Sequence, residues 1–73
     1  MDDIHKIDAC GLSSPQPALL THKAIESKIS GTVQVLVDST TARDSVIRTA
    51  QRAGWQVSLQ TRPDGVFQIS LTK

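Results

Sequence analysis

Three segments of the chain carry an apolar residue at every second position, and this pattern restricts the fold more than any other feature. The segments cover residues 33–37, 55–60 and 67–72. Alternate side chains of a β-strand point to opposite faces of a sheet, so each segment predicts a strand with one buried face. The last two segments are joined by Pro63-Asp64-Gly65, in which proline fixes φ and glycine accepts a positive φ. We therefore expect a C-terminal β-hairpin.

The segment before the first of these strands predicts a helix from about residue 15 to residue 30. Ser14 can accept a backbone N–H as the N-cap, and Pro15 suits the first helical position, where the N–H that proline lacks would have no partner. Gly31 suits the position just past the helix end. The predicted apolar face consists of Ala18, Ile25 and Ile29, with His22 beside it as a partly buried, hydrogen-bonded side chain.

A second helix is predicted between the strands at 33–37 and 55–60. Ser39, Thr40 and Thr41 are candidate N-caps, and Gly54 suits the end of the helix. The apolar side of this helix consists of Val46, Ile47, Ala50 and Ala53. Trp55 follows directly as the first inward residue of the next strand, which predicts a core position for its ring.

Residues 3–9 predict one more short strand, which Gly11 ends. The predicted order is βαβαββ, and the fold class is an α/β (α+β) two-layer sandwich with two helices on one face of a four-stranded mixed sheet. The polar alternates of the strands fit a second face open to water: Gln34, Gln56, Ser58, Gln68 and Ser70. We expect residues 1–73 to form one domain, because a chain of this length holds one compact core.

The composition argues against several classes of protein. The one cysteine, Cys10, excludes an intramolecular disulfide framework and a cysteine-rich zinc site, and no set of residues has metal-ligand spacing. A free thiol fits a reducing compartment, and no apolar run approaches the ~20 residues that span a bilayer. The net charge is +1 and the basic residues are scattered. We therefore expect a cytoplasmic protein without metal, cofactor, membrane or nucleic-acid partner.

The segment from Asp8 to Pro17 resembles the D-x-x-G-L-x-C-P-x-P motif of the TusA/SirA/YedF family of sulfur carriers. The fixed positions that agree are Asp8, Gly11, Leu12, Pro15 and Pro17. Ser14 stands where the family has its cysteine. Similarity continues downstream in Lys23-Ala24-Ile25, in the strand 33–37 with Asp38 after it, and in Ala42-Arg43-Asp44-Ser45-Val46 followed by Arg48, Ala50 and Gly54.

The resemblance implies a carrier whose cysteine accepts a sulfane sulfur from a cysteine desulfurase and passes it to a downstream acceptor of sulfur or selenium. A thiol at a helix N-terminus lies near unpaired N–H groups and the positive end of the helix dipole, which lower its pKa. The resemblance therefore assigns the carrier position to Ser14 and implies a desulfurase or an acceptor protein as partner. Lys23, Arg43 and Arg48 are candidate contacts with that partner.

Serine cannot perform this chemistry, because its hydroxyl does not ionise at neutral pH and oxygen forms no persulfide. Three accounts of Ser14 are open. The chain is a homologue that kept the fold as a non-catalytic interaction or regulatory module, or Ser14 is an engineered replacement, or Cys10 has taken over as the carrier. The alternative for Cys10 is a small buried side chain without chemistry. In each account we predict that residue 14 carries no sulfur.

Overall fold

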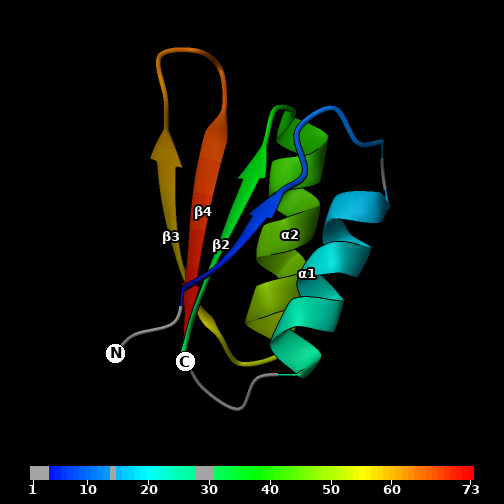
Figure 1. Cartoon of the computed structure of the whole chain (residues 1–73), viewed down its shortest axis with the longest axis vertical. Helices are drawn as coiled ribbons and strands as arrows, with labels where there is room; N and C mark the ends of the chain where they lie inside the picture. The colour runs from blue at the N-terminus through cyan, green and yellow to red at the C-terminus, as the bar shows by residue number, and fades with distance from the viewer. Residues whose placement is uncertain (1–3, 14, 28–30) are drawn as a thin grey trace.

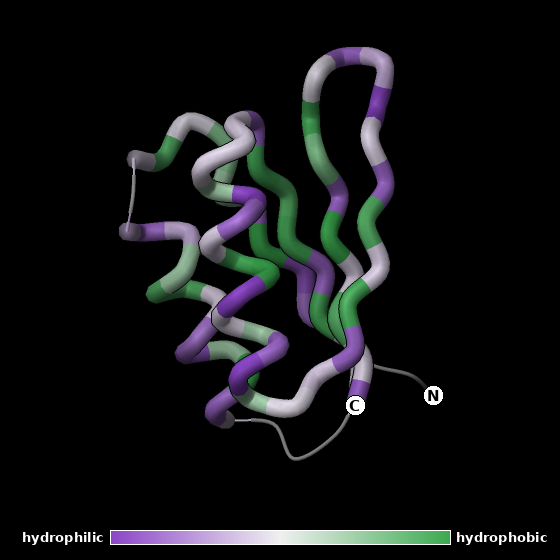
Figure 2. The backbone as a smooth tube through the Cα atoms, turned by 180° about the vertical axis from the view of Figure 1, so that it is seen from behind, coloured by the Kyte–Doolittle hydropathy of each residue, from purple (hydrophilic) through white to green (hydrophobic). Residues whose placement is uncertain are grey.

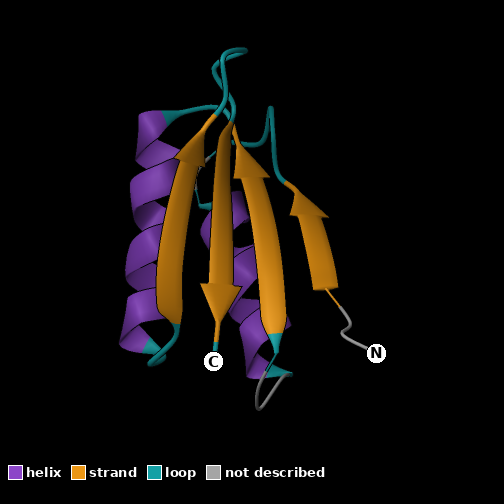
Figure 3. Ribbon diagram, turned by 90° about the vertical axis from the view of Figure 1, so that its left-hand side faces the viewer, coloured by secondary structure: helices purple, strands orange, loops and turns teal. Residues whose placement is uncertain are grey.

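The computed structural model describes residues 4–13, 15–27 and 31–73, and its helices and strands follow the predicted order (Figure 1). The elements are β1 (Ile4–Asp8), α1 (Gln16–Glu26), β2 (Thr32–Val37), α2 (Thr40–Arg52), β3 (Gln56–Thr61) and β4 (Phe67–Thr72). Both helices lie on one face of the sheet and the other face is open (Figure 3), which confirms the two-layer sandwich. The predicted helix residue Ile29 lies outside the described residues.

The strand order across the sheet is β1-β2-β4-β3. β1 runs parallel to β2, whereas β2 and β3 each run antiparallel to β4, so the sheet is mixed as predicted. The hairpin of β3 and β4 follows from the Pro63-Asp64-Gly65 turn, in which Gly65 has a φ of +87°. β1 and β3 are therefore the two edges of the sheet.

The core lies between the central strands and the two helices. Phe67 at the start of β4 is partly buried, whereas the other five inward alternates of β2 and β4 are fully buried: Val33, Val35, Val37, Ile69 and Leu71. They meet Ile25 of α1 and Val46 and Ala50 of α2. Trp55 is only 4% exposed, which confirms its predicted core position. Hydrophobic residues accordingly recur along the strands, while the helices expose hydrophilic turns (Figure 2).

Two predictions of side-chain burial are wrong. Leu59 in β3 is 43% exposed although it shares the helix-facing side of the sheet with the buried Ile69, its register partner. β3 is an edge strand, so the cover that buries Ile69 in the adjacent strand β4 does not extend over the Leu59 side chain. The side chain of His22 is 60% exposed, and its Nε2 lies 3.0 Å from Glu26 Oε2, one helical turn away.

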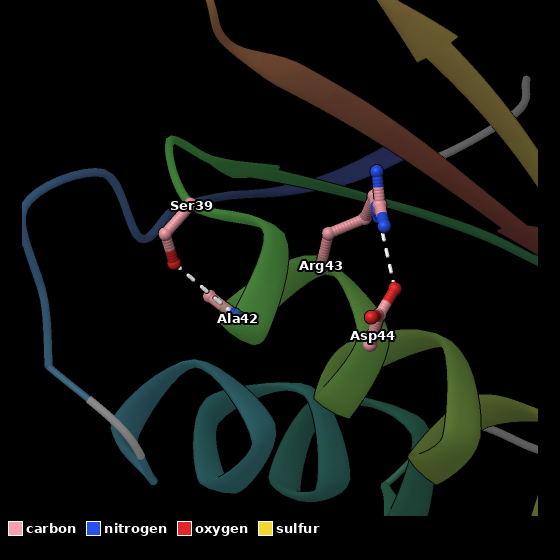
Figure 4. Close-up of polar contacts among 4 residues, drawn as sticks. All are labelled: Ser39, Ala42, Arg43 and Asp44. Carbon is pink, nitrogen blue, oxygen red and sulfur yellow. Dashed lines mark hydrogen bonds and ion pairs between the residues drawn. The ribbon is translucent and has the colours of Figure 1, made fainter.

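Helix α2 begins at a side-chain cap of the predicted kind. The Ser39 hydroxyl accepts the Ala42 N–H at 3.1 Å (Figure 4), which satisfies one of the backbone donors that a helix N-terminus leaves without a partner. The first turn also carries Arg43, whose Nε donates to Asp44 Oδ1 at 2.9 Å. The Arg43 guanidinium lies 5.0 Å from the centre of the Phe67 ring at the start of β4.

The register pair of Ile69 and Leu59 provides a matched test of where the core ends. Ile69→Ala should lower the free energy of unfolding by about 2–5 kcal/mol, because it opens a cavity in a fully buried site. Leu59→Ala should cost less than about 1 kcal/mol, because its site is already solvated. Urea unfolding at low micromolar concentration, followed by Trp55 fluorescence, measures both; equal losses would contradict the burial difference.

Candidate functional site

The motif loop, which joins β1 to α1 and covers residues 9–15, starts from a fixed point on the sheet. Ala9 is 1% exposed, and its N–H donates to the Leu36 carbonyl of β2 at 2.8 Å. This bond extends the parallel ladder of β1 and β2 by one residue. The Leu12 N–H then donates to the Ala9 carbonyl at 3.3 Å, which turns the chain towards α1.

Two carboxylates hold the backbone of this turn. Asp8 Oδ1 accepts the Cys10 N–H at 3.1 Å, and Asp38 Oδ2 accepts the Gly11 N–H at 3.1 Å. Asp38 directly follows β2, so its bond ties the motif loop to the neighbouring strand. Gly11 has a φ of +79°, a conformation that a residue with a Cβ rarely adopts. Asp8 and Gly11 of the motif thus have structural roles in the turn.

The contact of Asp38 is the part of the site that sequence reasoning missed. The sequence places Asp38 at the end of a strand, but it does not show which backbone group this carboxylate accepts. The parallel pairing of β1 with β2 brings Asp38 beside residue 11, which lies 27 positions away in the chain. The signal available in advance was the similarity to a family whose second strand has an aspartate after it.

Helix α1 begins one residue later than predicted. Its N-cap is Pro15, which has no side-chain capping bond, so the prediction of Ser14 as N-cap and Pro15 as first helical residue is wrong. The Gln16 N–H donates to the Ser13 carbonyl at 3.0 Å. Pro17 is fully buried, and its carbonyl accepts the Thr21 hydroxyl at 2.8 Å. Ser14 itself lies outside the described residues.

The thiol of Cys10 is half-buried in an acidic environment. Partial burial raises the pKa of the Cys10 thiol above its ordinary value, and hydrogen bonding to the Asp8 side chain raises it further. The charges of Asp8, Asp38 and Asp64 act in the same direction, because negative charge disfavours a thiolate. The expectation of a fully buried Cys10 is not met, and the surroundings also oppose the thiolate that sulfur transfer needs.

A groove of about 430 Å³ runs from the motif loop along the outer side of the helices. Its α1 wall is formed by Pro15, Ala18, Leu19 and His22, and its α2 wall by Thr49, Arg52 and Ala53. Pro15, the residue after position 14, lies at its start. Leu19 is 54% exposed, and Leu12 of the motif loop is exposed as well. The surface beside Pro15 is therefore apolar, with the imidazole of His22 and the basic side chain of Arg52 along it.

The other predicted partner contacts lie apart from the motif loop. Lys23 is exposed and lines a second hollow, between α1 and β1. Arg43 is engaged by Asp44 and the Phe67 ring, as described for the start of α2. Arg48 is exposed on α2. Of the predicted site residues, the structure thus brings together Asp8, Cys10 and Gly11.

Among residues 4–13, 15–27 and 31–73, no three His, Cys, Asp or Glu side chains gather in a way that would hold a metal ion. None of the helices in these ranges has the length and apolar character needed to cross a membrane.

Comparisons with known proteins agree on one family. A family model described as sulfurtransferase TusA matches residues 5–73. Among solved structures, the chain is similar to the crystal structure of a SirA-like protein from Desulfitobacterium hafniense, with 29% sequence identity, a TM-score of 0.87 and 96% of each chain covered. No curated protein matches the chain. These findings confirm the family resemblance that residues 8–17 predict.

The acidic surroundings of Cys10 predict a measurable pH dependence. Thiolate is the form that reacts with iodoacetamide, so the midpoint of the rate–pH profile should lie above that of a blocked cysteine peptide. Asp8→Asn removes a negative charge and should lower this midpoint, raising the rate at pH 7 by about two- to tenfold. Asp44→Asn is the matched control, since Asp44 is not among the carboxylates that act on the thiol. A wild-type midpoint below that of the peptide would contradict the raised pKa.

Proposed function

The chain belongs to the TusA sulfurtransferase family, and from this membership we propose that it docks on proteins of a persulfide relay without itself carrying sulfur at residue 14. The observation that carries the proposal is a motif loop whose backbone is held by Asp8 and Asp38 although Ser14 stands where the family has its reactive cysteine. Docking of a partner and transfer of sulfur are separable at this site. In the proposal the loop backbone serves docking, whereas sulfur transfer needs a thiol at position 14.

The contacts described for the loop are made by its backbone N–H groups and by the buried Pro17. Asp8 and Asp38 each accept a backbone N–H of the loop, and Pro17 anchors the start of α1 in the core. None of these bonds depends on a thiol. A protein that docks on the family's loop would therefore meet the same backbone path, with a hydroxyl in place of the nucleophile.

Ser14 rules out the carrier step on chemical grounds. In that step a thiolate attacks the outer sulfur of a donor persulfide, and the donor leaves as a thiolate. A serine hydroxyl is not ionised at neutral pH without a strong base, and an O–S adduct is not a persulfide. The raised pKa of the Cys10 thiol argues against that residue as a replacement carrier. We therefore favour the docking module over a carrier that uses Cys10.

The apolar surface beside position 14 is suited to docking. Leu12 and Leu19 are exposed, and the groove between the helices continues from Pro15 to Arg52. Exposed leucines next to a groove supply the apolar contact area from which partner binding gains most of its free energy. In this proposal a cysteine desulfurase or a downstream acceptor covers this surface.

Intact mass after incubation with a cysteine desulfurase and cysteine tests the chemistry. The wild type should gain no sulfur, whereas Ser14→Cys should gain about 32 Da, one sulfur atom, because the loop supports a thiol there. Cys10→Ala combined with Ser14→Cys should gain the same mass. If the wild type gains sulfur and Cys10→Ala abolishes the gain, Cys10 is the carrier and the proposal is wrong.

Docking is tested separately by calorimetry with the desulfurase. Leu19→Asp should weaken binding about tenfold or more, because it places a charge in an apolar contact. Leu59→Asp is the matched control, since Leu59 is similarly exposed but does not line the groove. Equal affinity of the wild type and Leu19→Asp would exclude the proposed surface.

A further inference from the structure

The two edges of the sheet differ in how they are protected against pairing with other chains. The edge strand β1 carries His5, Lys6 and Asp8, and charged side chains on an edge oppose the addition of another strand. The edge strand β3 has the sequence Gln-Val-Ser-Leu-Gln-Thr, with no charged residue and no proline. A six-residue edge of this kind is open to strand addition.

The hydrogen bonds of the sheet establish which backbone groups of β3 face outwards. The Arg62 N–H donates to the Val66 carbonyl at 2.9 Å, in line with the register of β3 and β4. Hydrogen-bonded and non-bonded pairs alternate along an antiparallel ladder. The even-numbered residues of β3 therefore bond to β4, and the N–H and C=O groups of Val57, Leu59 and Thr61 point away from it.

A second ladder gives the same result independently. Gly31 and Lys73 exchange both backbone bonds, at 3.3 and 3.2 Å, between the chain ends of β2 and β4. The odd-numbered residues of β4 therefore bond to β2, which leaves the even-numbered residues of β4 for β3. Both ladders therefore place the backbone N–H and C=O groups of Val57, Leu59 and Thr61 at the free edge of the sheet.

The side chains of this edge are nearly symmetric about Ser58. Gln56 and Gln60 lie at equal distances in sequence on either side of Ser58, as do Val57 and Leu59. We propose that a second copy of this chain pairs with the first along β3, antiparallel, with a two-fold axis through Ser58. The two four-stranded sheets then form one continuous sheet across the axis.

The antiparallel register centred on Ser58 pairs the outward backbone groups of β3 and places apolar side chains opposite apolar ones and polar side chains opposite polar ones. Val57 lies opposite Leu59 of the second copy, and the two residues exchange two hydrogen bonds through the groups that point outwards. The two-fold axis generates the equivalent pair, in which Leu59 lies opposite Val57 of the second copy. On the helix-facing side, Leu59, which is 43% exposed, packs against Val57 of the second copy. On the open face, glutamine faces glutamine and Ser58 faces its own copy.

The dimer leaves the motif loop free. β3 and β1 are opposite edges of the sheet (Figure 3), and the motif loop follows β1. Both copies therefore leave the groove that begins at Pro15 open to other proteins, so the dimer is independent of the proposed docking function. The interface is one strand wide, which places it at the low end of interface sizes. We expect a dissociation constant for the dimer between about 0.1 and 1 mM.

Sedimentation velocity across that range tests the dimer, with charge variants at the axis. Ser58→Lys and Ser58→Asp each place like charges face to face, and each should weaken association about tenfold or more. An equimolar mixture of the two variants should restore a heterodimer, because opposite charges then meet. Ser70→Lys, on the register partner of Ser58 in β4, is the matched control and should associate like the wild type.

Amide exchange by NMR shows where pairing occurs, and a thermal melt of each variant shows that it is folded. The amides of Val57 and Leu59 should gain protection as concentration rises, while those of Ser58 and Gln60, which already bond to β4, should not change. A wild type that stays monomeric at about 1 mM would overturn the proposal. So would association that persists in folded Ser58→Lys, a mixture that stays monomeric, or Val57 and Leu59 amides that remain unprotected.

Discussion

The antiparallel ladder between β2 and β4 is the interaction on which the rest of the structure depends. Its inward side chains form a fully buried apolar layer against which both helices pack. β2 also provides the ladder to which β1 adds in parallel, and β4 provides the ladder for β3. A small domain without a disulfide gains most of its stability from such a layer, because apolar burial is its main favourable term. The motif loop follows β1, which pairs with β2, and the free edge of the sheet is β3, which pairs with β4.

The backbone path of the motif loop is determined by the elements around it. Its path is fixed by β1 on one side, by Asp38 at the end of β2 on another, and by the buried Pro17 below. These contacts reach the backbone of the loop at Cys10 and Gly11. In the proposed function, Ser14 changes the chemistry of the family site, whereas the contacts of Asp8 and Asp38 need no thiol.

The open face and the two edges of the sheet differ in how their side chains oppose contact with other chains. Polar alternates keep one face of the sheet solvated, and charges on β1 discourage strand addition at that edge. β3 lacks such charges, and its side chains are nearly symmetric about Ser58. One fold thus separates two surfaces, with the motif loop beside α1 at one edge and an unprotected strand at the other.

The sequence by itself determined the order of the elements, the two-layer architecture, the central core and the family. Periods of two and of about 3.6 residues are local signals, and Val33, Val35, Val37, Ile69 and Leu71 carry them strongly enough to predict burial. The N-terminus of α1 was predicted one residue too early, because the preference of proline for the first helical position is a tendency and Pro15 is the N-cap here. Only the tertiary structure decided which strand lies at an edge, and hence that Leu59 is exposed. It also decided that Asp38 holds the Gly11 N–H and that carboxylates surround Cys10, since these contacts join segments distant in the chain.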